Sequence, residues 1–168
     1  MGYEQHKESA ASIKARCAVI TLSDTRDQSS DTSGAMIKQL LQAQSHPVVF
    51  YSVIRDDAEQ LNGLLDELQK RQDLDVILTN GGTGISRRDN TVGVIERHLT
   101  MPLPGFGELF RMLSYQQIQS GAMMSRALGG VAGGKLLFAM PGSTRAVELA
   151  MTKLILPELG HLLAELRK

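Results

Sequence analysis

The sequence has little of what secreted and membrane-spanning proteins need. Its 168 residues include one cysteine, Cys17, no tryptophan and only 4% aromatic residues. A single cysteine excludes a disulfide within the chain. Residues 1–14 lack the apolar centre of a signal peptide, and no later apolar run reaches the roughly 18 residues that span a bilayer. We therefore expect a cytoplasmic protein that does not enter the membrane.

An excess of charge of one sign is also absent. Eighteen Lys plus Arg balance eighteen Asp plus Glu, so the chain has no general basic field that would hold nucleic acid. The four histidines are scattered, without a pair at the spacing of zinc ligands. Cys17 lies in an apolar stretch and reads as a buried thiol, with a catalytic thiol as the alternative. Small molecules are the expected partners.

The pattern of apolar residues predicts an α/β domain. Its length suits one domain of three layers, with a mostly parallel central sheet flanked by helices. Residues 1–14 are polar without a clear period, so we expect a partly mobile N-terminal extension, followed by one domain over residues 15–168. Strands are expected at residues 16–22, 48–54, 76–78 and 136–140, and helices around residues 34–43, 61–68, 91–99 and 106–113 and after residue 143.

Residues 75–91 carry the strongest signal for chemistry. A short apolar run ends in glycines, and Gly81, Gly82 and Gly84 can adopt positive φ without a Cβ clash. Successive amides could then turn inward as an anion-binding nest, supplemented by the hydroxyl of Thr83. Phosphate is the expected ligand, and a plain strand-to-helix turn is the alternative.

The residues after the glycines suggest a cation as well. Arg87 and Arg88 bring positive charge, whereas Asp89 places a carboxylate where phosphates are expected. Since Mg²⁺ usually binds through one or two carboxylates plus substrate phosphates, Asp89 is a candidate Mg²⁺ ligand. The alternative is that Asp89 or Asn90 caps the helix that begins at Thr91.

Other polar groups follow the ends of predicted strands. Ser23 and Asp24 follow the first strand, and Asp56 follows the second. The carboxyl ends of parallel strands line the crevice where ligands bind, so these loops could converge there. The alternatives are a Ser or Asx turn for the first pair and a helix N-cap for Asp56 or Asp57. The glycine-rich stretch 129–135 lacks the Ser or Thr of a Walker A motif and is interpreted as a loop leading into a strand.

Pro141, Gly142 and Ser143 form a further turn, which leads from a predicted strand into the last helix. Ser143 is a candidate N-cap of that helix, and the helix N-terminus is a second candidate anion site.

Taken together, these motifs resemble the MoaB/MogA family of molybdenum cofactor biosynthesis proteins. The resemblance rests on Gly-Gly-Thr-Gly followed by Arg-Asp, and on the motifs at residues 104–108, 125–126 and 141–143. It runs from about residue 15 to about residue 161. Details at residues 106–111, 141–143 and 156–161 favour the MoaB branch. Asn80 departs from the family, which more often has Thr there, and Asn90 interrupts a common Arg-Asp-Val-Thr.

The resemblance implies a function and residues for it. It implies adenylylation of molybdopterin by Mg-ATP, with Asp56 and Asp89 as catalytic carboxylates and Mg²⁺ ligands. A protein of the same pathway that binds molybdopterin without catalysis is the alternative. Residues implied in binding molybdopterin or nucleotide are Ser23, Asp24, Gly81, Gly82, Thr83, Gly84, Ser114, Ser125, Arg126, Pro141, Gly142 and Ser143.

The resemblance also implies assembly. A homotrimer, or a hexamer built from two trimers, is expected, together with contacts to other molybdenum cofactor biosynthesis proteins. The apolar stretch at residues 106–113 is the candidate surface between subunits. From the residues alone, the stripe indicates core packing or subunit contact, with a ligand-binding surface as the alternative.

Overall fold

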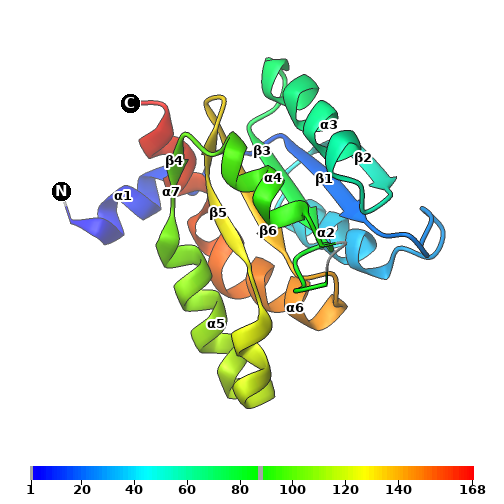
Figure 1. The fold of residues 1–168 in the computed structure, drawn as a ribbon. Helices are drawn as coiled ribbons and strands as arrows, with labels where there is room; N and C mark the ends of the chain where they lie inside the picture. The colour runs from blue at the N-terminus through cyan, green and yellow to red at the C-terminus, as the bar shows by residue number, and fades with distance from the viewer. Residues whose placement is uncertain (1, 87–88) are drawn as a thin grey trace.

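A six-stranded sheet forms the centre of the molecule. The computed structural model describes residues 2–86 and 89–168, and in this part the strand order is β2-β1-β3-β6-β5-β4 (Figure 1). β1, β2, β3 and β6 are parallel, while β5 runs antiparallel to both β6 and β4. The strands are β1 (Cys17–Leu22), β2 (Val48–Ile54), β3 (Val76–Asn80), β4 (Met101–Pro102), β5 (Leu128–Ala132) and β6 (Lys135–Met140).

Helices cover both faces of this sheet. The chain forms α1 (Tyr3–Ala10), α2 (Thr32–Ala43), α3 (Ala58–Lys70), α4 (Thr91–His98), α5 (Pro104–Ile118), α6 (Thr144–Ala150) and α7 (Leu156–Leu166). A 3₁₀ helix, η1 (Gln119–Met124), follows α5, and a π-helical turn, η2 (Met151–Ile155), joins α6 to α7. Apolar side chains of α3 and α4 pack on one face, and those of α2, α5, α6 and α7 on the other. The predicted three-layer fold is confirmed.

The apolar runs of the strands explain the two cores. Successive side chains point to opposite faces, so Val19 and Leu78 join one core while Ile20 and Ile77 join the other. Both faces are buried, which is why these strands read as continuous apolar runs rather than alternating ones. On the α5 face, the ring of Phe138 meets that of Phe106 edge to face at a centroid distance of 4.9 Å.

The connections create a crevice between β1 and β3. The helix after β1, α2, lies on one face of the sheet, and the helix after β3, α4, lies on the other. Chains that leave neighbouring strands toward opposite faces open a gap at the carboxyl ends of those strands. The candidate site residues follow these strand ends.

The glycines at residues 129–135 do not form the predicted loop. They belong to a hairpin, in which Gly133 and Gly134 take φ of 56° and 73° between β5 and β6. Two central residues with positive φ suit the tight turn whose twist matches the strands. Gly129 lies within β5, where a Cβ would come within 2.4 Å of Phe138 Cδ1, so glycine leaves room for that ring. The loop interpretation was therefore wrong for residues 129–132, which form a strand, whereas Gly133 and Gly134 do turn the chain into β6.

The beginning of the chain also differs from expectation. Residues 3–10 form α1, which packs beside α7, so the two ends of the chain lie on the same side of the molecule (Figure 1). Lys7 forms an ion pair with Glu158, and Ala10 is buried. These partners are about 150 residues away in sequence, which is why the local pattern predicted no helix. The mobility of this segment and the domain boundary at residue 15 stay predictions.

No helix within residues 2–86 and 89–168 combines the length and apolar character needed to cross a membrane.

Replacing Phe138 by Ala should lower the free energy of unfolding by about 3–5 kcal/mol, because it leaves a cavity beside Phe106 in the larger core. Denaturant unfolding followed by circular dichroism measures this. Gln42→Ala, on the exposed side of α2, is the control and should change stability by less than about 0.5 kcal/mol. A loss below about 1 kcal/mol in Phe138→Ala would contradict the packing described.

Candidate functional site

Three strand ends converge at the carboxyl edge of the sheet. Asp24, after β1, accepts a hydrogen bond at Oδ1 from the backbone N–H of Asp56, after β2, at 3.2 Å. Asp56 Oδ1 in turn accepts from the hydroxyl of Thr91, at the start of α4, at 3.4 Å. Asp57, rather than Asp56, caps α3 by accepting from the N–H of Gln60 at 2.7 Å. The carboxylate of Asp56 is thus left to face the loop after β3.

The glycine loop, which begins at Gly81 and ends at Asp89, packs tightly against its neighbours. Gly81 and Gly82 have φ of 95° and 64°. A Cβ at Gly81 would lie 2.2 Å from Leu22 O, and one at Gly82 would lie 2.0 Å from Thr91 Oγ1 and 2.7 Å from Asp56 Oδ1. Glycine is therefore required at both positions by conformation and by space.

The predicted amide nest is smaller than expected. The N–H of Gly81 donates to Met140 O at 3.0 Å and so is already used within the sheet. Gly84 does not adopt positive φ, so that part of the prediction was wrong. Gly84 instead leaves room for Asp89, since a Cβ there would lie 2.7 Å from Asp89 Oδ2. Within this loop, positive φ is confined among the glycines to Gly81 and Gly82, which lie close to Leu22 and Asp56.

Asp89 closes the other end of the loop. Its Oδ2 accepts from the N–H of Ser86 at 2.8 Å, and its own N–H donates to Ser86 O at 3.0 Å. Asn90 precedes α4 without a capping hydrogen bond from its side chain. Asn90 thus occupies the N-cap position without the side-chain bond that the alternative interpretation expected, and Asp89 bonds within the loop. Arg87 and Arg88, expected to bring positive charge, lie outside the described residues.

The carboxylates are crowded. Burial raises the pKa of Asp56, and the nearby negative charges of Asp89 and Asp24 raise it further, against the effect of the Thr91 hydrogen bond. Like charges held together favour binding of a cation between them. Within the described part of the chain, no group of three or more His, Cys, Asp or Glu side chains is arranged to hold a metal by itself. Asp56 and Asp89 would suit Mg²⁺ only if substrate phosphates completed its ligands.

Arg126 holds the loop rather than facing open solvent. Its Nε donates to Thr83 O at 3.2 Å, and its Nη2 donates to Gly84 O and, at 2.8 Å, to Asp89 O. One guanidinium therefore joins both ends of the glycine loop. The resemblance implied instead that Arg126 binds molybdopterin or nucleotide directly. The structure shows Arg126 donating to backbone carbonyls.

A cavity of about 350 Å³ lies beside the glycine loop. It brings together most of the predicted binding residues, whereas Ser23, Asp24, Asp56 and Asp89 are not among its lining residues. Ser23 instead accepts at Oγ from the N–H groups of Thr25 and Arg26, which is the Ser turn considered as the alternative. The predicted residues that line the cavity are Gly81, Gly82, Thr83, Gly84, Ser114, Ser125, Pro141, Gly142 and Ser143.

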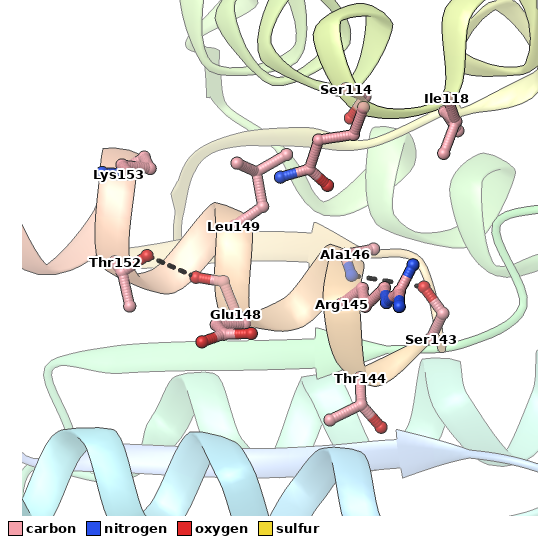
Figure 2. Close-up of a pocket in the computed structure, with 11 residues that line it drawn as sticks. Ser114, Ile118, Ser143, Thr144, Arg145, Ala146, Glu148, Leu149, Thr152 and Lys153 are labelled. Carbon is pink, nitrogen blue, oxygen red and sulfur yellow. Dashed lines mark hydrogen bonds between the residues drawn. The ribbon is translucent and has the colours of Figure 1, made fainter.

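A larger groove continues from this cavity. It measures about 770 Å³ and lies between α5 and the helix formed by α6 and η2. Figure 2 shows Ser114 and Ile118 of α5 facing residues 143–153 across it. The two spaces share Ser114, Ile118, Ser143 and Ala146, so a ligand in the cavity can extend into the groove. The Oγ of Ser143 accepts from the N–H of Ala146 at 3.2 Å, as an N-cap does.

Beneath the site lies a buried polar network. The side-chain amide of Asn80 donates to Thr21 Oγ1 at 2.8 Å, and Thr21 donates to Asp31 Oδ2 at 2.6 Å. Tyr51 donates to the same carboxylate oxygen at 2.7 Å, and burial followed by this bond raises the pKa of the tyrosine. Asn80 Oδ1 is buried without a partner among the described atoms. Asn80, which stands where the family more often has Thr, therefore links the end of β3 to the end of β1 beneath the glycine loop.

Cys17 is buried at the amino end of β1, and burial followed by the charge of Asp75 raises its pKa to about 12, so it is not a reactive thiolate.

Arg26 contacts Ser33 and the carbonyl of Gly142, close to the glycine loop. The sequence pattern does not single out Arg26, because it lies in a polar loop without periodicity.

Comparisons with known proteins agree with this architecture. Residues 18–161 match the profile of a family described as a probable molybdopterin binding domain. Molybdenum cofactor biosynthesis protein B of Halalkalibacterium halodurans is 47% identical over 169 positions, which cover 100% of this chain and 99% of the relative. A crystal structure of molybdenum cofactor biosynthesis protein B aligns with a TM-score of 0.89 at 48% identity, covering 92% of this chain and 97% of the other. The tungsten cofactor synthesizing protein MoaB from Pyrococcus furiosus aligns at 0.83 and 32% identity, covering 92% and 98%.

Replacing Asp56 by Asn should raise the melting temperature of the ligand-free protein at neutral pH. The raised pKa of Asp56 means that its charged form opposes folding, and Asn keeps an acceptor for Thr91. The gain should vanish as the pH falls below about 4, where the carboxyl is neutral in both the folded and the unfolded chain.

Scanning calorimetry across this pH range measures the effect. The neighbouring Asp57→Asn, which keeps its cap on α3, is the control and should change little. Equal melting temperatures for Asp56→Asn and the unmodified protein at neutral pH would contradict the crowding of the carboxylates.

Proposed function

This chain belongs to the molybdopterin-binding domain family that includes molybdenum cofactor biosynthesis protein B, and we propose on that basis that it binds molybdopterin and adenylylates it with Mg-ATP. The feature that supports this most directly is the glycine loop, which borders both a pair of carboxylates and a cavity for a ligand. Carboxylates of Asp56 and Asp89 lie against Gly82 and Gly84, and a cavity for a ligand lies beside the same loop. A cation held by these carboxylates and an organic anion in the cavity would therefore lie next to neighbouring residues of the same loop.

The reaction needs little covalent chemistry from the protein. An oxygen of the terminal phosphate of molybdopterin attacks the α-phosphorus of ATP, and the bond from that phosphorus to the pyrophosphate oxygen breaks. Adenylyl-molybdopterin and pyrophosphate result, with no bond to a side chain. The rate enhancement then comes from aligning two anions and stabilising charge that develops between them.

The residues divide this work. Asp56 and Asp89 would hold Mg²⁺, which when bound would neutralise negative charge on the phosphates. Backbone N–H groups after Gly81 and the hydroxyls of Ser114 and Ser125 are available to an anion in the cavity. Arg126 acts one step away, because it holds the loop that carries these groups.

Space supports binding of two ligands. The cavity of about 350 Å³ and the groove of about 770 Å³ share residues, so they provide one continuous recess. Sites for drug-sized ligands range from roughly 300 to 1,000 Å³. Molybdopterin and the nucleotide could therefore occupy neighbouring parts at the same time.

A protein that binds molybdopterin without turning over ATP is the second candidate. It is favoured by Arg126, whose Nε and Nη2 donors are used by backbone carbonyls and so do not offer a ready second phosphate site. Calorimetric titration of each ligand separately distinguishes the two functions. A binder alone would show affinity for molybdopterin but none for ATP or AMP with Mg²⁺ present.

Replacing Asp89 by Asn should lower adenylyl transfer by about 100-fold, because an amide loses the charge that attracts Mg²⁺ but keeps an oxygen for the Ser86 N–H. The assay combines purified protein, molybdopterin, Mg²⁺ and ATP, and follows both pyrophosphate and adenylyl-molybdopterin. Asp57→Asn is again the control. Full turnover by Asp89→Asn with a native melting temperature would remove Asp89 from the catalytic role.

We also propose that the protein is a trimer or a pair of trimers, joined through α5. The predicted contact stretch splits in two, because Phe106 and Phe110 are buried in the core of the chain itself. The neighbouring face of α5 and η1 remains apolar and exposed, with side chains of Leu109, Met112, Tyr115, Ile118, Met123 and Met124. Exposed apolar patches of this kind mark association surfaces.

Light scattering at micromolar concentration should give three or six times the mass of one chain. Met112→Glu combined with Tyr115→Glu should reduce it to a single chain while leaving the far-ultraviolet circular dichroism unchanged, because both residues are exposed in the isolated chain. A single-chain mass for the unmodified protein would refute the assembly.

A further inference from the structure

A polar seam joins the first turn of α2 to the turn that follows β6. Ser33 Oγ donates to Gly142 O at 2.8 Å, and Arg26 Nη1 donates to the same carbonyl at 3.2 Å. Arg26 Nη1 also lies 3.1 Å from Ser33 Oγ, which it can use as an acceptor. Next to them, the hydroxyls of Thr32 and Thr144 are 3.2 Å apart. Gly142 is therefore held from one side by a guanidinium and a hydroxyl.

The position of Arg26 is itself fixed by the end of β1. Its backbone N–H donates to Ser23 Oγ at 3.1 Å, in the turn that follows the strand. Ser33 is fully buried, so its hydroxyl has few alternative orientations. The hydrogen bonds of Arg26 and Ser33 thus fix Gly142 relative to the end of β1 and the first turn of α2.

Gly142 forms part of the wall of the ligand cavity. A Cβ at Gly142 would lie 3.1 Å from Gly81 Cα, so the two backbones are in close contact. The N–H of Gly81 donates to Met140 O, which ties the glycine loop to the end of β6 as well. A shift of the turn at residues 141–143 would therefore change both the cavity and the start of the glycine loop.

We infer that Arg26 is a positioning residue for the ligand cavity, which it shapes by clamping Gly142 against the glycine loop; this inference rests on the proposed binding of molybdopterin there. Arg26 does not line the cavity, so its effect reaches the ligand through Gly142. Its guanidinium donates to two oxygens through one nitrogen, and a hydrogen bond from a charged donor to a half-buried carbonyl is stronger than one between neutral groups.

Two measurements on the full chain test this inference. Arg26→Met keeps the stem and removes the donors, so hydrogen–deuterium exchange of the ligand-free protein should become faster at residues 141–146. The affinity for molybdopterin, measured by calorimetry, should fall about tenfold, as expected for loss of one such hydrogen bond. Arg26→Lys retains a charged donor and should recover affinity to within about threefold.

Ser33→Ala removes the other hydrogen-bond donor to the carbonyl of Gly142. It should also weaken molybdopterin binding, and the double variant should bind no more than about twofold more weakly than Arg26→Met, because both side chains act on Gly142 O. Arg71→Met is the matched control. Arg71 also donates two hydrogen bonds, to Asp73, but it lies between α3 and β3, toward the amino end of that strand, and should affect neither measurement.

The outcomes are distinct. Unchanged exchange at residues 141–146 in Arg26→Met and in Ser33→Ala, or faster exchange with unchanged affinity, would overturn the inference. Equal losses in Arg26→Lys and Arg26→Met would also overturn it, because no donor would then matter. If the unmodified protein does not bind molybdopterin, the proposed function itself fails and the inference fails with it, a result recognisable because every variant would then lack binding.

Discussion

The close approach of backbone to backbone at Gly81 and Gly82 is the constraint on which the site depends. At these two residues the chain turns through positive φ, and the carbonyl of Leu22 and the side chains of Asp56 and Thr91 occupy the space that a Cβ would take. The ends of β1 and β2 and the start of α4 can therefore crowd around one loop. Any larger residue would separate the strand ends and, with them, the carboxylates. The grouping of Asp56 and Thr91 around the loop therefore requires that residues 81 and 82 have no side chain.

Polar contacts then give the crowded edge its shape. Arg126 joins the two ends of the glycine loop from one side, and Arg26 holds the facing turn at Gly142 from another. Both guanidinium groups donate to backbone carbonyls, so they fix conformation whatever side chains occupy the loops. Below them, Asp31 accepts from both Thr21 and Tyr51 and caps α2, which gives the buried carboxylate its hydrogen-bond partners.

The sequence predicts the fold and the convergence of the loops well, and the contacts between distant segments poorly. The second strand was expected at residues 48–54 and occurs there as the half-buried edge strand β2, because its apolar and aromatic residues form a local run. The strand at residues 128–132 was missed because Gly129 and Gly130 lie in it to leave room for Phe138 and for β4, and such contacts are not a local property of the sequence. Arg126 was implied to bind molybdopterin or nucleotide, whereas in the structure its guanidinium donates to the glycine loop. Its partners were not predictable, since they are backbone carbonyls some 40 residues away.

The groove between α5 and α6 has a consequence for how such proteins can diverge. The carboxylates come from the connections after β2 and β3, whereas the walls of the groove come from two helices whose residues do not touch those carboxylates. Substitutions at Leu149, Thr152 or Lys153 would alter which molecule fits in the groove while leaving Asp56 and Asp89 in place. Related chains could therefore come to bind different ligands through changes in two helices and still keep the same pair of carboxylates.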